Sequence, residues 1–270
     1  MRRARSLTRP ISSSSVGGPL SARVGCTWRR GADQQGGASP AVPAGYIRFR
    51  DQLAEIGGAL TFRVPALTED APIRLQIRSG CLGDAAMSGR HATGGVVASS
   101  NPQLCGNRSG WWGFAGVTNA DGALRERAGS GLEAECEALP PAAASGEKLL
   151  PSTARATSAH ALRTAWVLHA LGPTSFHARE SEAALRRTYA ACFDLADSLG
   201  LGSLALPALA CGVAGFPATA GARAAFDAVE RHAAAAAGAA GGTLARVEFV
   251  LLDRRVYCEF ADEAWSRWQR

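Results

Sequence analysis

Short apolar segments alternate with longer amphipathic segments along most of this chain, and this alternation constrains the fold more than any other feature. Segments 59–65 (ALTFRVP) and 73–79 (IRLQIRS) alternate apolar and polar residues, as strands do. Segment 180–200 is typical of a helix that stops at a glycine, and its apolar face consists of Leu185, Tyr189, Cys192, Phe193, Ala196 and Leu199. The alternation predicts a layered α/β fold with a largely parallel interior sheet.

The other segments continue this pattern to the end of the chain. We expect strands within 94–100, 165–173, 203–209 and 247–253, and helices over 121–139, 219–238 and 256–269. The folded domain is therefore expected over 46–270, with its core over about 74–259. Ligands of such folds bind at the loops that follow the carboxyl ends of the strands, so these loops hold the candidate site residues.

The first 45 residues differ in composition from the rest of the chain. Residues 1–32 contain seven arginines and no acidic residue, and a Gly/Ala/Pro-rich stretch follows them. This composition is typical of an organellar transit peptide with a linker, and we expect 1–45 to be disordered. The mature protein would then be mitochondrial or chloroplastic. An ordinary basic tail is the alternative, and it would leave the protein cytoplasmic or nuclear.

The positive charge of the chain lies almost entirely in this segment. Beyond residue 32 the chain has 22 basic and 23 acidic residues, so the domain itself is close to neutral. Nucleic-acid binding by the domain is therefore not expected. A membrane span is not expected either, because no stretch of about 18 apolar residues occurs.

The seven cysteines are scattered along the chain. No two of them are closer than 19 residues, so the CxxC spacing of metal and redox sites is absent. We expect reduced thiols, no metal and no cofactor.

Three loops hold residues that can bind a ligand. In the first, Asp84 follows segment 73–79 and can accept a hydrogen bond from an exocyclic amine or a ribose hydroxyl. The alternative for Asp84 is a helix N-cap.

The second loop runs from Asn101 to the helix expected at Asp121. Trp111, Trp112 and Phe114 lie in it and need burial or a ligand face, so they form a candidate aromatic lid. Asp121 and Gly122 stand at the start of the helix, where a phosphate or a sugar hydroxyl can bind. An N-cap is again the alternative for Asp121.

The third loop, 207–217, contains Gly212 and Gly215, whose spacing allows backbone N–H groups to turn toward a phosphate. Cys211 has no histidine or aspartate spaced to activate it, so a non-catalytic cysteine is favoured. His169 lies inside an expected strand, which favours a hydrogen-bonded core histidine.

Six short motifs, in this order, resemble the macrodomain family and specifically its ADP-ribosyl-hydrolase branch. They are Gly83-Asp84, Val97-Ala98-Ser99-Ser100-Asn101, Asp121-Gly122-Ala123-Leu124 followed by Ala128-Gly129, Glu135-Cys136, 166–173 (WVLHALGP), and Leu206-Pro207 followed by 212–217 (GVAGFP). The resemblance implies a three-layer α/β/α fold with a central mixed, largely parallel sheet. The sequence departs from the family pattern at Ala98, Arg125, Ala214 and Leu252, and the family's glycine run before the aspartate is replaced by Val117-Thr118-Asn119-Ala120.

The resemblance also implies roles for individual residues. Asn101 would orient the distal ribose, and Asp121 would position or polarise the attacking water. The ligand-binding set would be Asp84, Ala85, Gly122, Cys211, Gly212, Val213, Ala214, Gly215 and Phe216. Asp84 would take the adenine amino group, and the 212–215 backbone would bind the diphosphate. We expect a monomer whose partner is ADP-ribose or an ADP-ribosylated protein.

Three functions remain open at this point. The first is an enzyme that removes ADP-ribose from mono-ADP-ribosylated proteins or deacetylates O-acetyl-ADP-ribose. The second is a non-catalytic reader of ADP-ribose. The third is a degenerate domain used for protein contacts, with segment 111–116 (WWGFAG) as a docking surface.

Overall fold

The computed structural model describes residues 44–65, 73–106, 119–173, 178–212, 214–238 and 242–268. Residues 1–43 of the expected transit peptide and linker therefore lie outside the described residues, whereas residues 44 and 45 begin a helix. Trp111, Trp112 and Phe114 of the candidate lid also lie outside the described residues, as does Val213 of the third loop.

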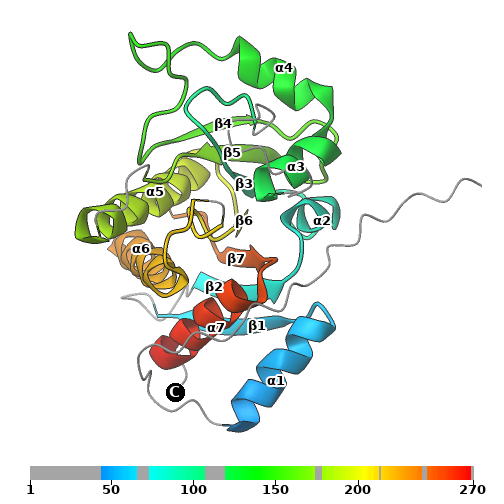
Figure 1. The fold of residues 1–270 in the computed structure, drawn as a ribbon, viewed down its shortest axis with the longest axis vertical. Helices are drawn as coiled ribbons and strands as arrows, with labels where there is room; N and C mark the ends of the chain where they lie inside the picture. The colour runs from blue at the N-terminus through cyan, green and yellow to red at the C-terminus, as the bar shows by residue number, and fades with distance from the viewer. Residues whose placement is uncertain are drawn as a thin grey trace, which may run out of the picture.

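The described residues form one seven-stranded sheet with strand order β1-β2-β7-β6-β3-β5-β4 (Figure 1). The strands are β1 (Ala59–Val64), β2 (Ile73–Ser79), β3 (Gly95–Ser99), β4 (Ala154–Ser158), β5 (Trp166–Ala170), β6 (Ser203–Leu206) and β7 (Arg246–Leu251). The five interior strands are parallel, and the two edge strands β1 and β4 are antiparallel to their neighbours. The sheet is thus mixed and largely parallel, which confirms the predicted fold class.

Helices cover both faces of the sheet and make the outer two layers. One face is covered by α5 (Ala178–Ser198), α6 (Ala218–Gly238) and α7 (Arg254–Trp268), with α1 (Ala44–Glu55) packed beside α7. The other face is covered by α2 (Leu82–Met87), α3 (Ala120–Ala128) and α4 (Ser130–Ala138). Figure 1 shows α5 and α6 on one side of the sheet and α2 and α3 on the other.

The larger core lies under α5, α6 and α7, where aromatic side chains meet the sheet. Phe249 of β7 contacts the rings of Tyr189, Phe226 and Phe260, with centroids 5.3 to 5.9 Å apart. The predicted apolar face of α5 is confirmed, since five of its six residues are fully buried and Leu199 is half-buried. This burial holds α5, α6 and α7 against one face of the sheet.

One predicted helix is wrong. Segment 121–139 forms two helices, because Gly129 between them adopts φ 77° and ψ −176°. A positive φ is accessible to glycine at little cost, and the break lets α4 turn away from α3. Asp121 and Arg125 therefore belong to a short helix of nine residues.

Besides the short helix α2, two further elements have no counterpart among the expected ones. The edge strand β4 reads ARATS and carries no apolar alternation, and it is held by antiparallel pairing with β5. The other is α1, which begins at Ala44 and is held by the Tyr46 ring against Trp265 and by an Arg50–Asp262 ion pair. Both elements form through tertiary contacts, which the local sequence does not report. None of the described helices has the length and hydropathy needed to cross a membrane.

Candidate functional site

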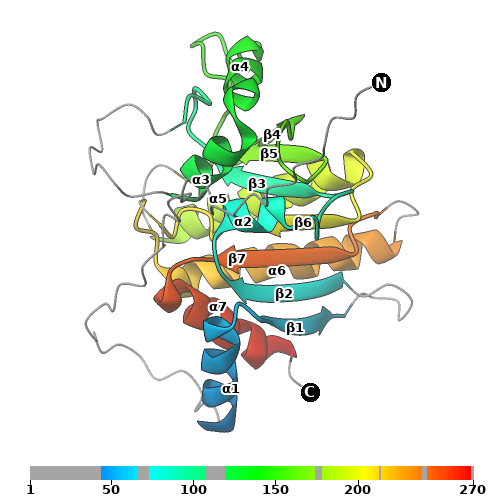
Figure 2. The same cartoon turned by 90° about the vertical axis from the view of Figure 1, so that its right-hand side faces the viewer.

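The three loops predicted to hold the site all leave the same edge of the sheet. They follow the carboxyl ends of β2, β3 and β6, which are parallel within the interior of the sheet. In Figure 2 the arrowheads of β3 and β7 point to the same side of the molecule, where α3 lies. This edge is where ligands bind in open α/β sheets.

Asp84 lies in the first turn of α2, and its side chain is 69% exposed. One carboxylate oxygen accepts a hydrogen bond from Arg127 Nη2 of α3 at 2.5 Å. The N-cap position of α2 is Cys81, so the N-cap interpretation of Asp84 is wrong. The carboxylate is thus open to solvent and held in place by α3. The next residue, Ala85, is buried, and its N–H donates to the Cys81 carbonyl at 3.1 Å.

Asp121 is buried in the first turn of α3, with 3% of its surface exposed. Its Oδ2 accepts a hydrogen bond from Arg125 Nε at 2.9 Å, and no described group donates to its Oδ1. The N-cap of α3 is Asn119, whose side chain accepts from Gly122 N–H at 2.7 Å, so the N-cap interpretation of Asp121 is wrong as well.

Burial sets the electrostatics of this ion pair. It raises the pKa of the Asp121 carboxyl, and the neighbouring Arg125 guanidinium opposes that shift. For Arg125, burial alone would lower the pKa, but the Asp121 carboxylate outweighs burial and the pKa rises. Asp121 is therefore a carboxyl with raised basicity whose second oxygen has no described protein partner.

Asn101 organises the segment that follows β3. Its side-chain oxygen accepts from Cys105 N–H at 3.3 Å, and its Nδ2 donates to the Gly106 carbonyl at 3.0 Å. These bonds close the chain from 101 to 106 into a tight loop that contains two positive φ angles, 57° at Leu104 and 69° at Gly106.

Arg125 links this loop to Asp121. Its Nη2 donates to the Leu104 carbonyl at 3.0 Å, and its side chain lies so close to Gly106 that a Cβ there would be 2.9 Å from it. The structure therefore joins the two predicted catalytic residues through Arg125 and the 101–106 loop. No direct contact joins Asn101 to Asp121 in the described part of the chain.

The third loop contains two residues with a positive φ angle. Ala210 adopts φ 62° and Gly215 adopts φ 75°. Phe216 N–H donates to the Ala210 carbonyl and Gly215 N–H to the Gly212 carbonyl, at 3.0 and 2.9 Å. Within the described residues, the N–H groups of Gly212 and Ala214 donate to no acceptor, and both residues are exposed. Two unsatisfied backbone donors at a sheet edge can bind an anion.

Buried groups support this loop from below. The Tyr189 hydroxyl of α5 accepts from Leu209 N–H at 2.8 Å, and the Phe216 ring is buried. Burial raises the pKa of the Cys211 thiol to about 12, so this thiol is not an activated nucleophile. Cys211 contributes to the site as a packed side chain against Gly221, where a Cβ would lie 2.3 Å from its sulfur.

His169 is the hydrogen-bonded core histidine that the sequence predicts. It is fully buried in β5 and forms hydrogen bonds with the hydroxyls of Ser100 and Thr157, at 3.1 and 2.9 Å. Burial lowers its pKa to about 4, so the ring is neutral at physiological pH. Its hydrogen bonds connect β5 to Ser100 at the end of β3 and to Thr157 of β4.

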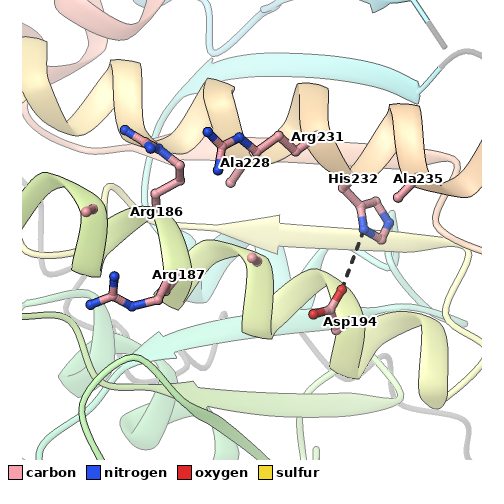
Figure 3. A pocket seen from close by; sticks show the side chains of 9 residues that line it. Arg186, Arg187, Asp194, Ala228, Arg231, His232 and Ala235 are labelled. Atoms are coloured by element: carbon pink, nitrogen blue, oxygen red, sulfur yellow. Dashed lines mark ion pairs between the residues drawn. The ribbon is translucent and has the colours of Figure 1, made fainter. Parts of the chain in front are cut away.

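Two cavities of about 470 Å³ each lie among the described residues. One adjoins the site, and its wall includes Leu104, Cys105 and Arg125. The other is a groove between α5 and α6 that Figure 3 shows from close by, and it contains none of the predicted site residues. Its position on the outer helix layer separates it from the ligand edge.

Comparison with known proteins identifies the domain. The Macro domain family model matches residues 107–225. A macro domain-containing protein of Streptomyces griseus is 33% identical over 167 residues, which are 62% of this chain and 84% of that protein. The chain belongs to the macrodomain family. A Pantoea vagans relative of this macrodomain, named O-acetyl-ADP-ribose deacetylase 1, is 32% identical over 163 residues, covering 60% and 85% of the two chains.

The fold comparison agrees with this assignment. The Oceanobacillus iheyensis macrodomain, solved with ADP, superposes on this macrodomain with a TM-score of 0.60. Its sequence is 20% identical, and the match covers 76% of this chain and 94% of that chain. The three-layer macrodomain fold implied by the sequence motifs is therefore confirmed.

Sequence reasoning missed three contributors to the site. Asn119 caps α3, Arg127 holds Asp84, and Tyr189 supports the third loop. Of these, only Asn119 had a local signal, because asparagine three residues before a helical glycine is a common cap. The other two act across the fold from distant parts of the chain.

Proposed function

We propose that this macrodomain binds ADP-ribose and hydrolyses a bond at its distal ribose, either in mono-ADP-ribosylated proteins or in O-acetyl-ADP-ribose. The observation that carries the proposal is the meeting of three groups at one sheet edge. These are an exposed carboxylate at Asp84, two free N–H groups in the 207–217 loop, and the buried carboxylate of Asp121.

The binding part of the proposal rests on complementary chemistry. Asp84 accepts from the exocyclic amine of adenine, and its pair with Arg127 holds it in place for that contact. The N–H groups of Gly212 and Ala214 donate to the diphosphate, as free amides in a turn with positive φ angles do. A relative named as a deacetylase of O-acetyl-ADP-ribose and a neighbour solved with ADP support the choice of this ligand class.

The catalytic part rests on Asp121 and Asn101. The buried Oδ1 of Asp121, which has no described partner, can accept a proton from a water molecule or orient that water toward the ribose. Burial favours this role, because a raised pKa makes the carboxylate a better proton acceptor near neutral pH. Asn101 holds the 101–106 loop and so positions the wall beside the ribose. The reaction is hydrolysis. In an ADP-ribosylated protein the water oxygen bonds to the distal ribose and the protein side chain leaves with a proton; in O-acetyl-ADP-ribose it bonds to the acetyl carbon, and acetate and the ribose hydroxyl are the products.

A reader without catalysis is the second candidate, and one observation favours it. Arg125 already occupies Oδ2 of Asp121, where a hydrolase would keep its carboxylate for water and ribose. In that case the domain would bind ADP-ribose without turning over its esters.

Calorimetric titration of the full chain with ADP-ribose tests binding, and release of acetate from O-acetyl-ADP-ribose tests catalysis. We expect saturable micromolar binding, and turnover that falls at least about 100-fold in Asp121→Asn while binding persists. Turnover that Asp121→Asn leaves unchanged would overturn the catalytic role, and binding without any turnover would establish the reader. If titration of the wild-type protein with ADP-ribose produces no heat of binding, both the hydrolase and the reader proposals are overturned.

A further inference from the structure

Three arginines lie side by side across three neighbouring strands. Arg63 of β1 pairs in register with Arg74 of β2, and Arg74 pairs with Arg246 of β7. Residues paired in register point to the same face of a sheet. The alternate residues Val64, Ile73 and Val247 are buried in the core under α7, so the arginines point to the opposite face. With strands about 4.8 Å apart, this arginine row is roughly 10 Å long.

The guanidinium groups of the row have no anionic partner in the described part of the chain. Arg63 and Arg74 are exposed, and Arg246 is half-buried. One nitrogen of Arg246 donates to the Arg90 carbonyl, while its Nε is buried without an acceptor. Like charges directly opposite each other destabilise a sheet, so the row carries an electrostatic cost that a bound anion would remove.

The one acid on these three strands does not neutralise the row. Glu248 is the one acidic residue of β1, β2 and β7, and it lies two register pairs further along, beside Gln76. It is fully buried and engaged by Arg78 at 2.5 Å, His91 at 2.6 Å and Arg90 at 3.4 Å. Arg78 and Arg90 therefore pair with this carboxylate, and within the described residues the row is a concentrated positive charge on a domain whose net charge is close to zero.

The chemistry of the face favours phosphate over a protein or a lipid surface. Guanidinium groups bind phosphate oxygens through two parallel hydrogen bonds. The other residues on this face of β1 and β2 are Ala59, Thr61, Gln76 and Arg78. Protein hot spots combine arginine with tryptophan and tyrosine, and membrane binding needs apolar side chains to insert. This set contains no aromatic and no large apolar side chain.

We propose that the arginine row binds the phosphodiester backbone of a single-stranded nucleic acid. An extended strand can follow a flat row across the sheet, whereas a duplex presents its phosphates on a curved surface. No aromatic side chain is available on this face of β1 and β2 for base stacking, so binding is independent of sequence and depends strongly on salt.

The row is separate from the proposed ADP-ribose site. Arg74 and Arg246 stand at the amino ends of β2 and β7, and the ligand loops leave the carboxyl ends of the same sheet. The length of β7 puts roughly 17 Å between the two edges. Both ligands can therefore be bound at once, and the inference does not depend on the proposed function.

Fluorescence anisotropy of a labelled oligothymidylate of about 20 nucleotides, titrated with the full chain, tests the inference. We expect the double variant Arg63→Gln/Arg74→Gln to weaken binding about tenfold at low salt. The slope of log affinity against log salt concentration should be less steep in the double variant by roughly 1.4. Each phosphate contact on a single strand contributes about 0.7 to that slope, and the variant removes two contacts. Its binding of ADP-ribose should match that of the wild type.

The matched control is Arg187→Gln/Arg231→Gln. Both arginines line the α5–α6 groove of Figure 3 and form no ion pair with a described residue, so this double variant removes the same charge elsewhere. Unchanged oligothymidylate binding in the control supports the row as the site. An equal loss in the control, no loss in the row variant, or equal affinity for polyglutamate would overturn it. Failure of ADP-ribose to bind would overturn the proposed function alone.

Discussion

Arg125 Nε donates a hydrogen bond to Asp121 Oδ2 at 2.9 Å, one helical turn away along α3, and both side chains are buried. The carboxylate that this macrodomain would use on its ligand is thus half engaged by its own helix. Its other oxygen, Oδ1, and the Nη1 of Arg125 have no hydrogen-bond partner among the described residues. The pair therefore offers one buried acceptor and one buried donor beside the ligand loops.

A double-mutant cycle should reveal this pair as a strong coupling. We expect Arg125→Met and Asp121→Asn each to lower the free energy of unfolding by about 3 kcal/mol, because each leaves a buried partner without its counter-charge. The double variant should lose less than the sum of the two, with a coupling of roughly 1–3 kcal/mol. Urea unfolding of the four proteins measures it, and additive losses would contradict a buried ion pair.

Asp84 should affect ligand affinity much more than stability. Its side chain is 69% exposed, and exposed ion pairs such as the one with Arg127 contribute at most about 1 kcal/mol. We expect Asp84→Ala to weaken ADP-ribose binding about tenfold through the lost hydrogen bond to adenine. Calorimetry checks this, with Glu126→Ala, an exposed acid on α3, as the matched control. Equal effects of the two variants would argue against adenine recognition by Asp84.

The 207–217 loop should depend on the backbone conformation of Gly215. Its φ is 75°, and a Cβ there would meet nothing within 4 Å, so Gly215→Ala adds conformational strain without a clash. We expect a stability loss of about 1–2 kcal/mol and weaker ADP-ribose binding. Gly212→Ala is the control for stability, because Gly212 has equal space and no positive φ. Thermal unfolding of both variants measures this difference in stability. Equal unfolding temperatures would show that residue 215 does not require the left-handed φ that glycine provides.

Acid should destabilise the domain through His169. Burial lowers its folded-state pKa to about 4, below the usual value of 6.5, so the unfolded chain takes up the proton first. Its contribution is fully present above pH 6.5 and is lost as the pH falls toward 4, by about 3 kcal/mol in total. Unfolding free energies measured across this range should fall in the wild type and stay flatter in His169→Gln. Parallel curves would show that another group titrates there.

Glu248 acts in a separate pH range. Its pKa is held at about 2 by His91, Arg78 and Arg90, which together outweigh burial. Its contribution is present above about pH 4.5 and is lost as the pH falls toward 2. The two buried groups can therefore be distinguished by the pH at which stability declines.

The sequence alone determined the layers of this domain and the loops that hold its candidate site residues. Period-two segments gave β1 and β2, and the apolar face from Leu185 to Leu199 gave α5, because burial of a repeating apolar face is a local property of the chain. The motif at Asp84, the pair Asp121-Gly122 and the 212–217 loop could be placed at the carboxyl edge of the sheet because each belongs to a connection that leaves the end of a strand.

The tertiary structure decided what those residues touch. Three hydrogen bonds depend on side-chain directions and on elements that meet only after folding. They join Arg125 to Asp121, Arg127 to Asp84, and Leu209 N–H to the Tyr189 hydroxyl. The arginine row could not be read from the sequence either, because Arg63, Arg74 and Arg246 become neighbours only through strand register. Composition averages charge over the chain, whereas register concentrates it on one face of the sheet.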